Sequence, residues 1–277
     1  MYIDTHCHLN FKAFKNDLLE VVKKSQEAGV KKIIVPGTDL ESSQKAVEIA
    51  EKINGIYAVV GFHPHHAKGL DGVGGEIKKE LKKLAKSKKV VGIGECGLDY
   101  YVYQKTKYDK TEITTELKNL QKQLFGMQLQ LAKELNLPMV IHNREAGEEI
   151  LDVMNHFSKS NNKMPRGVFH CISGSKEYLE KILDLGFYIG VDGNVTYSKN
   201  VKKLAKKVPL NRLLLETDAP YLTPEPVRSE KINRGEKLRN EPISVKITAE
   251  YLADLKKVSL DKIIASTTKN AEDLFNI

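Results

Sequence analysis

The sequence predicts a (β/α)₈ barrel of the TIM type, built as one domain over residues 1–277. Eight short apolar runs rich in β-branched residues alternate with amphipathic helical stretches, and this alternation uses nearly the whole chain. No linker rich in Pro, Gly or Ser divides the 277 residues, and barrels of this type have about 250. A doubly wound open sheet is the alternative, but it has no need of eight repeats followed by a further helix.

Each of the eight apolar runs is short, and its apolar residues occupy both faces of a strand. This pattern is typical of parallel strands that are covered by helices. The predicted strands are Tyr2–Thr5, Lys32–Pro36, Ile56–Gly61, Val90–Gly94, Met139–Ile141, Gly167–Phe169, Phe187–Val191 and Leu213–Glu216.

Between the strands, apolar residues recur every three to four positions, as they do in helices with one buried face. Gly29 ends the first such stretch, and Pro138 stops the longest. The stretches are marked, in chain order, by Leu18, Val21 and Val22; Ala46, Ile49 and Ile53; Ile77, Leu81 and Leu84; Leu117, Leu124 and Leu131; Ile150, Val153 and Met154; Leu179, Ile182 and Leu183; and Val201, Leu204 and Ala205. Two further helices, around Val245–Leu255 and Leu260–Phe275, close the chain.

The composition predicts a folded protein. Apolar residues make up 41% of the chain and charged residues 29%, which excludes wholesale disorder. The net charge of +8 is compatible with an acidic partner such as nucleic acid, but most lysines lie in amphipathic stretches such as Glu76–Lys89. The three cysteines lack disulfide-type spacing, and there is neither an apolar signal stretch nor a membrane-spanning one. We therefore expect a cytoplasmic protein without membrane association.

Two loops stand out, because both follow strands at the end of a barrel where active sites are built. Tyr100–Glu116 is long and polar and follows the fourth strand, and Thr223–Pro242 follows the eighth. Four of the six arginines fall in segments that we expect around this mouth: Arg144, Arg228, Arg234 and Arg239.

Imidazole and carboxylate side chains stand at the ends of six predicted strands. In a barrel these strand ends meet at one rim, although they are spread over more than 200 residues of sequence. The side chains are His6 and His8, His63, Glu95, His142, His170 and Asp218.

This ring of side chains predicts a site for two divalent metal ions, since such ligands suit Zn, Mn and related ions, with Mg where oxygen ligands dominate. Residues i and i+2 of a strand point the same way, so His6 and His8 can ligate one ion together. His142 and His170 come from adjacent strands and can ligate the second ion. Glu95 lies between the two groups and is suited to bridging them, and Asp218 closes the ring.

The cysteines Cys7, Cys96 and Cys171 each neighbour a proposed ligand in sequence. The period of two in a strand turns them to the opposite side from that ligand. We therefore expect them to pack against helices and not to bind metal.

These segments also form a set of motifs that occurs in order across nearly the whole chain, and this ordered set is far more specific than the short His-x-His alone. The motifs are Asp4-Thr5-His6-Cys7-His8-Leu9, Gly61-Phe62-His63-Pro64-His65, Gly92-Ile93-Gly94-Glu95-Cys96-Gly97-Leu98-Asp99-Tyr100, Pro138-Met139-Val140-Ile141-His142-Asn143-Arg144-Glu145, His170-Cys171-Ile172-Ser173-Gly174, Leu215-Glu216-Thr217-Asp218-Ala219-Pro220-Tyr221-Leu222 and Arg239-Asn240-Glu241-Pro242. By them the sequence resembles the TatD family of metal-dependent hydrolases, a branch of the amidohydrolase-like barrels.

The resemblance implies a TIM-type barrel, two divalent ions and hydrolysis of phosphodiester bonds, usually of DNA. It implies metal ligation by residues that are all present here: His6, His8, Glu95, His142, His170 and Asp218. Some members of the family lack the His-x-His pair, which this chain retains. The chain departs from the family in its two loops, 100–116 and 223–242, which look longer than is typical.

We expect a deoxyribonuclease, with exonuclease action on single-stranded ends of DNA and no obligate protein partner. In the hypothesis for the reaction, water attacks the phosphorus and Asp218 takes its proton, with Glu95 as the second catalytic group.

His65 is the best candidate for contacting phosphate, whereas His63 could instead only shape the turn at Pro64. Arg144 and Arg239 could each pair with phosphate or form a structural ion pair. Tyr221, like Tyr100, could stack on a base or pack within its loop. Asn194 and Glu216 are expected to be structural.

Two rival functions remain at this stage. The same barrel and ligands would serve a C–N or acyl-ester hydrolase of the amidohydrolase or aminoacyl-tRNA deacylase type. Relatives of that kind often bridge their metals with a modified lysine after the fourth strand, where this chain has Glu95. A nucleic-acid-binding protein with structural metals is the second rival, but structural zinc sites are usually closed and rich in cysteine.

Overall fold

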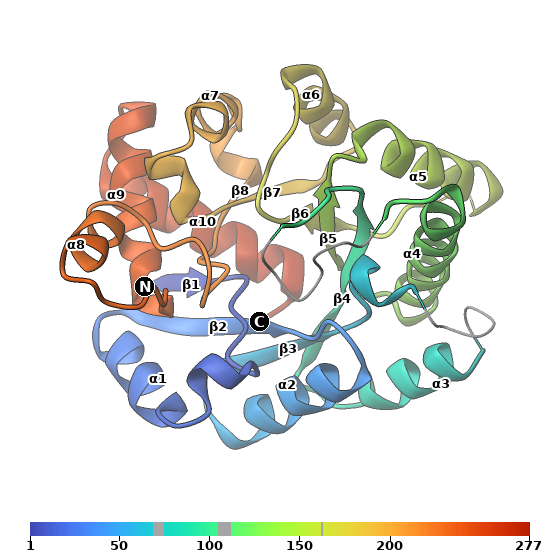
Figure 1. Cartoon of the computed structure of the whole chain (residues 1–277), viewed down its shortest axis with the longest axis horizontal. Coiled ribbons are helices and arrows are strands. Elements are labelled where there is room, and N and C mark those ends of the chain that lie inside the picture. Colours follow the sequence, from blue (N-terminus) through green and yellow to red (C-terminus); the bar gives the residue numbers. More distant parts are fainter. Residues whose placement is uncertain (69–74, 105–111, 162) are drawn as a thin grey trace.

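The computed structural model of the chain describes residues 1–68, 75–104, 112–161 and 163–277. Eight parallel strands form one sheet in which each strand pairs with the next along the chain, from β1 to β8 (Figure 1). The strands are β1 (Tyr2–Asp4), β2 (Val30–Pro36), β3 (Ile56–Val60), β4 (Val90–Asp99), β5 (Met139–Arg144), β6 (Gly167–Phe169), β7 (Tyr188–Val191) and β8 (Leu213–Leu215). The predicted barrel is confirmed, and β4 and β5 run further than the sequence indicated.

The sheet closes where the segments after β1 and β8 lie side by side. The Thr5 amide donates to the carbonyl of Leu215 at 3.0 Å, and the Asp218 amide donates to the carbonyl of His6 at 2.8 Å. Cys7 and Ala219 form an isolated parallel bridge between the same two segments. This closure brings the His-x-His segment at the start of the chain against Asp218, 210 residues later.

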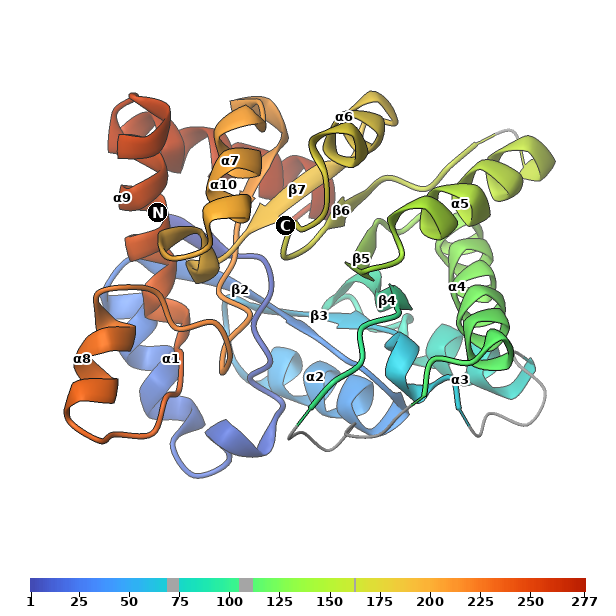
Figure 2. The same cartoon turned by 45° about the horizontal axis from the view of Figure 1, so that its top comes forward.

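Helices cover the outside of the barrel in an almost continuous ring (Figures 1 and 2). The helices are α1 (Leu18–Glu27), α2 (Leu40–Lys52), α3 (Gly75–Leu84), α4 (Thr115–Leu135), α5 (Gly147–Asn161), α6 (Lys176–Asp184), α7 (Lys199–Lys207), α8 (Val227–Asn233), α9 (Val245–Lys256) and α10 (Leu260–Phe275). None of the helices in the described parts of the chain has the length and apolar character needed to cross a membrane.

Both loops predicted to be irregular are shorter than expected. The segment 223–242 contains helix α8. None of the residues of this helix is buried, so the sequence shows no apolar face that would predict it. Helix α4 begins at Thr115, capped by the Thr114 side chain, and so takes the end of the loop expected at Tyr100–Glu116. Residues 105–111 of that loop lie outside the described residues.

The interior of the barrel is closed by the last helix, α10. Apolar side chains from seven strands meet three side chains of this helix in one buried cluster. The cluster consists of Ile3, Ile34, Val59, Val91, Val140, Val168 and Leu214 with Ala271, Leu274 and Phe275. Figure 1 shows α10 behind the ring of strands, with the C-terminus near its centre. Because the opposite end of the barrel is thus filled, the polar rim is left with a solid apolar floor.

We expect Leu274→Ala to lower the free energy of unfolding by about 2–5 kcal/mol, the cost of truncating a fully buried Leu in a packed core. Leu274 has no exposed surface. Urea denaturation followed by circular dichroism measures the change. The matched control is Lys269→Ala in the same helix, whose side chain is 73% exposed and whose loss should cost no more than about 0.5 kcal/mol. Equal effects of the two substitutions would contradict this packing.

Candidate metal centre

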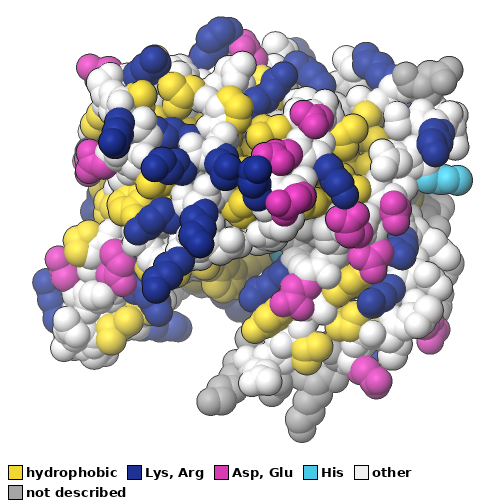
Figure 3. Space-filling model, turned by 90° about the horizontal axis from the view of Figure 1, so that it is seen from above, with side chains coloured by type: hydrophobic (Ala, Val, Ile, Leu, Met, Phe, Trp, Pro, Cys, Tyr) yellow, Lys and Arg dark blue, Asp and Glu magenta, His cyan; other side chains and the backbone are white. Residues whose placement is uncertain are grey.

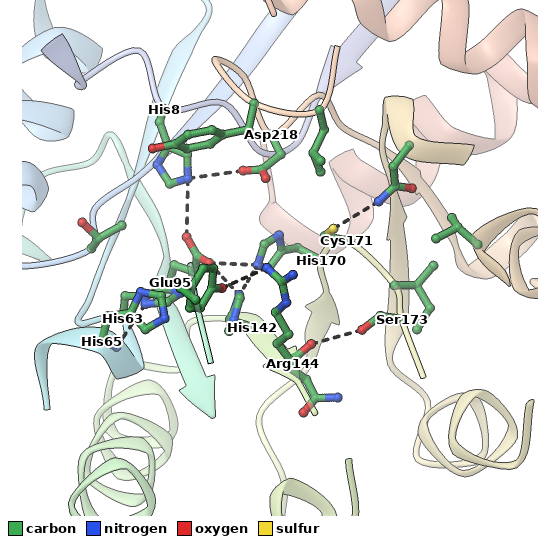
Figure 4. A pocket seen from close by; sticks show the side chains of 18 of the residues that line it. His8, His63, His65, Glu95, His142, Arg144, His170, Cys171, Ser173 and Asp218 are labelled. Atoms are coloured by element: carbon green, nitrogen blue, oxygen red, sulfur yellow. Dashed lines mark hydrogen bonds and ion pairs between the residues drawn. The ribbon is translucent and has the colours of Figure 1, made fainter. Parts of the chain in front are cut away.

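The predicted ligands meet at the carboxyl ends of the strands, as the barrel requires. They come from the segments after β1, β6 and β8 and from within β4 and β5, and Figure 4 shows most of them around one cavity. The side chains that come together are His6, His8, Glu95, His142, His170 and Asp218.

Strand β4 positions Glu95 through an irregularity that two glycines allow. The register of β4 against β5 shifts between Ile93 and Cys96, and Gly94 and Gly97 have φ of +146° and +144°. A Cβ at Gly97 would come within 1.9 Å of the carbonyl oxygen of His142. Only glycine therefore lets the two strands approach here, and this approach places the Glu95 carboxylate beside the His142 ring.

The first group of side chains surrounds Oε2 of Glu95. The Nε2 atoms of His6 and His8 lie 3.2 Å apart and lie 3.4 and 3.5 Å from that oxygen. Oδ1 of Asp218 completes the group, 3.4 Å from Nε2 of His8 and 3.7 Å from Nε2 of His6. Two imidazole nitrogens and two carboxylate oxygens thus converge on one point.

The second group surrounds the other carboxylate oxygen, Oε1 of Glu95. Nε2 of His170 lies 2.9 Å from it and Nδ1 of His142 lies 3.1 Å from it. These two ring nitrogens are 3.1 Å apart. Nε2 of His63, for which the sequence left a phosphate contact and a turn-shaping role open, lies 3.4 Å from the same oxygen. One carboxylate therefore faces two separate sets of imidazoles with its two oxygens.

This donor set fits divalent cations. Imidazole nitrogens with carboxylate oxygens are the usual ligands of Zn and Mn, whereas a Mg site would be expected to contain more oxygen. The triads His6–Glu95–His170 and His6–His8–Asp218 each bring three such atoms within 4.8 Å of one another. At most one proton can lie between the facing Nε2 atoms of His6 and His8, so a cation satisfies the cluster better than hydrogen bonds do.

Asp99 supports the centre from behind, in a role that its place in the sequence did not indicate. Its Oδ2 lies 3.0 Å from Nε2 of both His142 and His65 and accepts a hydrogen bond from the Tyr103 hydroxyl at 2.8 Å. His142 therefore turns its Nδ1 to Glu95 because Asp99 holds its other nitrogen. The sequence did not indicate this role, because the predicted strand ended at Gly94 whereas β4 continues to Asp99.

The charges at the site keep its carboxylates ionised. Burial raises the pKa of Glu95, but His170 and His63 outweigh this and hold the pKa well below its usual value. Burial also raises the pKa of Asp218, but the hydrogen bond from His8 outweighs this effect, so the pKa is lowered. Burial also lowers the pKa of His142, but its bonds to Asp99 and Glu95 outweigh this and raise the pKa to about 9. The negative charge that stabilises a proton there also favours a bound cation.

The centre forms one side of a cavity of about 620 Å³. In Figure 3 the surface is hollowed between two projecting lobes, with hydrophobic side chains inside the hollow. Of the four residues predicted to bind substrate, His65, Arg144 and Tyr221 line the cavity. Arg144 donates to the Tyr103 hydroxyl at 3.0 Å and lies 3.8 Å from the centre of the Tyr101 ring. Tyr221 is 54% exposed, beside Phe11.

Arg239 occupies the other of its two predicted roles. Its guanidinium pairs with Asp17 at 2.7 Å and with Glu241 at 2.8 Å, and it is absent from the cavity lining that the described residues form. Arg228 and Arg234 likewise lie near acids of their own helix region. Of the four arginines in segments expected around the mouth, Arg144 is the one that lines the cavity formed by the described residues. Figure 3 shows Lys and Arg spread over the outer helical face, as the lysine pattern predicted.

Two aromatic and thiol predictions also need correction. Tyr100 is buried, with the Lys118 ammonium 4.5 Å from the centre of its ring, so it cannot stack on a base. Cys7 and Cys96 are buried in the core between strands and helices, as predicted, but Cys171 lines the cavity. Its φ of +48° turns the chain after β6, and no sequence pattern signals such a turn at a non-glycine residue.

Comparison with known proteins identifies relatives along the whole chain. Residues 3–276 match the family model described as TatD related DNase. A Bacillus subtilis protein named uncharacterized metal-dependent hydrolase YabD is 38% identical, with both chains fully covered. A Pantoea ananatis protein named 3′-5′ ssDNA/RNA exonuclease TatD is 32% identical over 99% of both chains. The crystal structure of YJJV, a TatD homolog from Escherichia coli, has a TM-score of 0.83 at 29% identity, covering 100% of this chain and 98% of the other.

We expect Asp99→Asn to weaken binding of Zn or Mn by about 10- to 100-fold, the usual effect of losing a carboxylate that orients a ligating histidine. Isothermal titration of the metal-stripped protein measures the affinity. Tyr103→Phe is the control, because it removes one hydrogen bond to Asp99 but keeps the carboxylate charge, and its affinity should stay closer to that of the wild type. Unchanged affinity in a folded Asp99→Asn protein would rule out the supporting role.

Proposed function

The chain belongs to the TatD-related DNase family, and on that basis we propose that it is a divalent-metal-dependent hydrolase that cleaves phosphodiester bonds of DNA. One observation carries the proposal: a single carboxylate, Glu95, faces two sets of imidazoles within a cavity. Two-metal sites of this kind stabilise both the attacking and the leaving oxygen of a phosphoryl centre.

Six residues would hold two ions in this proposal. His6, His8 and Asp218 would bind one, and His142 and His170 the other, with one oxygen of Glu95 directed to each. When bound, divalent ions neutralise charge on the phosphoryl oxygens and lower the pKa of water toward neutrality. The imidazole-rich set favours Zn or Mn over Mg.

Asp218 is the group that accepts the proton of the attacking water. Its pKa is lowered, so the carboxylate is ionised at neutral pH, and it lines the cavity with 15% of its side chain exposed. The carboxylate is thus close to the imidazoles and also accessible from the cavity, as a proton acceptor must be.

Four further residues orient the substrate. His65 lies at the edge of the second imidazole group, and Arg144 presents the rest of its guanidinium to the cavity, where both can contact phosphate. The exposed Tyr221 and the partly buried Phe11 form an aromatic corner next to His8, on which a base can stack. Such a corner favours single-stranded ends, whose bases are free to unstack.

We expect a chelator to abolish DNA cleavage and added Mn or Zn to restore it, because the phosphoryl charge is otherwise not neutralised. End-labelled single-stranded and duplex DNA, incubated with EDTA or with Mg, Mn or Zn, provides the assay, and the fragment ladder separates exonuclease from endonuclease action. Glu95→Ala should lose the activity in every metal. Wild-type protein that cuts no DNA in any metal would exclude the nuclease and favour the amide or acyl hydrolase. A Glu95→Ala protein that cuts normally would show that the cleavage does not come from this metal centre.

We expect Asp218→Asn to lower kcat by about 10²- to 10⁴-fold, the usual contribution of a positioned general base, with a smaller change in KM. Steady-state kinetics on single-stranded DNA at saturating metal separates these two constants. Asp17→Asn is a suitable control, because that carboxylate pairs with Arg239 away from the cavity. A kcat equal to that of the wild type would remove Asp218 from the proton transfer.

A further inference from the structure

The cavity extends well beyond the metal centre, along the side formed by the loops after β5 to β8. In Figure 4, Cys171 and Ser173 lie on the opposite side of the cavity from His63 and His65. We call this side the amide pocket; it is lined by Asn143, Ile172, Ser173, Asn194, Val201 and Leu222. None of these residues takes part in the ion pairs of the metal centre, so the pocket is available for another part of the substrate.

The amide pocket combines apolar surface with buried amides that still lack partners. Ile172, Val201 and Leu222 supply the apolar surface. The Oδ1 atoms of Asn143 and Asn194 are buried and have no hydrogen-bond partner among the residues that the structure describes. Because a buried polar atom without a partner costs free energy, a ligand with polar groups at its edge would be stabilised here.

The charges around the pocket exclude a second phosphate. Its lining contains no Lys or Arg within the described part of the chain. An anionic group would therefore meet no compensating cation in this lining, whereas a neutral ring needs none.

We propose that the amide pocket binds one nucleobase of the substrate strand while the adjoining phosphate lies at the metal centre. The inference rests on the proposed nuclease function and adds a base-binding site to it. A base is flat and apolar on its faces and carries hydrogen-bonding groups on its edge, which side-chain amides bind well. The cavity of about 620 Å³ lies within the range of roughly 300–1,000 Å³ that small-ligand sites have, well above what a phosphate alone requires.

The test compares two single-stranded oligomers of equal length: oligothymidylate and an oligomer of tetrahydrofuran abasic units, which keeps the phosphates but has no bases. The variant is Val201→Trp, which fills the pocket from the first turn of α7. The control is Lys203→Trp, whose side chain is exposed two residues further along the same helix. For the wild type and both variants, the affinity for Zn or Mn is measured together with kcat/KM on each oligomer.

We expect wild type and Lys203→Trp to prefer oligothymidylate. Val201→Trp should lower that preference by roughly tenfold, the lower end of what one bound base contributes, with unchanged metal affinity and an unchanged rate on the base-free oligomer. If Val201→Trp disturbs metal binding, Asn194→Ala is used instead, and it should likewise lower the preference for oligothymidylate.

The possible failures are distinguishable. A variant that slows both oligomers equally, or that keeps the wild-type preference, overturns the base pocket and leaves the nuclease proposal standing. A wild-type protein that cuts neither oligomer in any metal contradicts the nuclease function and the pocket with it.

Discussion

The structure of the site depends on one buried carboxylate, that of Glu95. A buried charge is costly unless it is surrounded by partners, and here two sets of imidazoles provide them, one on each oxygen. These partners come from strands at opposite sides of the barrel, so the carboxylate can be satisfied only when the ring of strands is complete. The imidazoles that stabilise the buried carboxylate also form a cluster of donor atoms for divalent cations. Folding and function therefore rely on the same contacts.

The barrel makes this arrangement rigid from two directions. The backbone bonds between the segments after β1 and β8 fix the His6–His8 pair against Asp218. At the other end, the side chains of α10 fill the interior beneath the rim. Each ligand is therefore held by strand backbone over a packed core, which is how a site is kept within the small tolerances that metal binding and phosphoryl transfer require.

Much of the fold and the main groups of the site could be predicted, because they depend on patterns that survive in sequence. Eight apolar runs, and polar residues at their ends, are sufficient to place His6, His142 and Asp218 on one rim. The remainder depends on departures from those patterns. Asp99 lies beside His142 because β4 continues past the predicted strand end at Gly94, and Cys171 enters the cavity at a residue with positive φ. Arg239 had two equivalent predictions, and only the position of Asp17 decides between them.

The two sides of the cavity differ in charge, because Arg144 lies on one side only, and this difference orients a substrate. On the side of His65, the cationic Arg144 lies over aromatic rings, whereas the described residues that line the amide pocket include no Lys or Arg. A phosphodiester strand is itself divided between charged phosphates and neutral bases, so only one orientation places each part against a compatible surface. Electrostatic complementarity of this kind contributes to specificity more than to affinity. The side chains around the metal centre would thus select how a strand enters, while the six proposed ligands provide the setting for its hydrolysis.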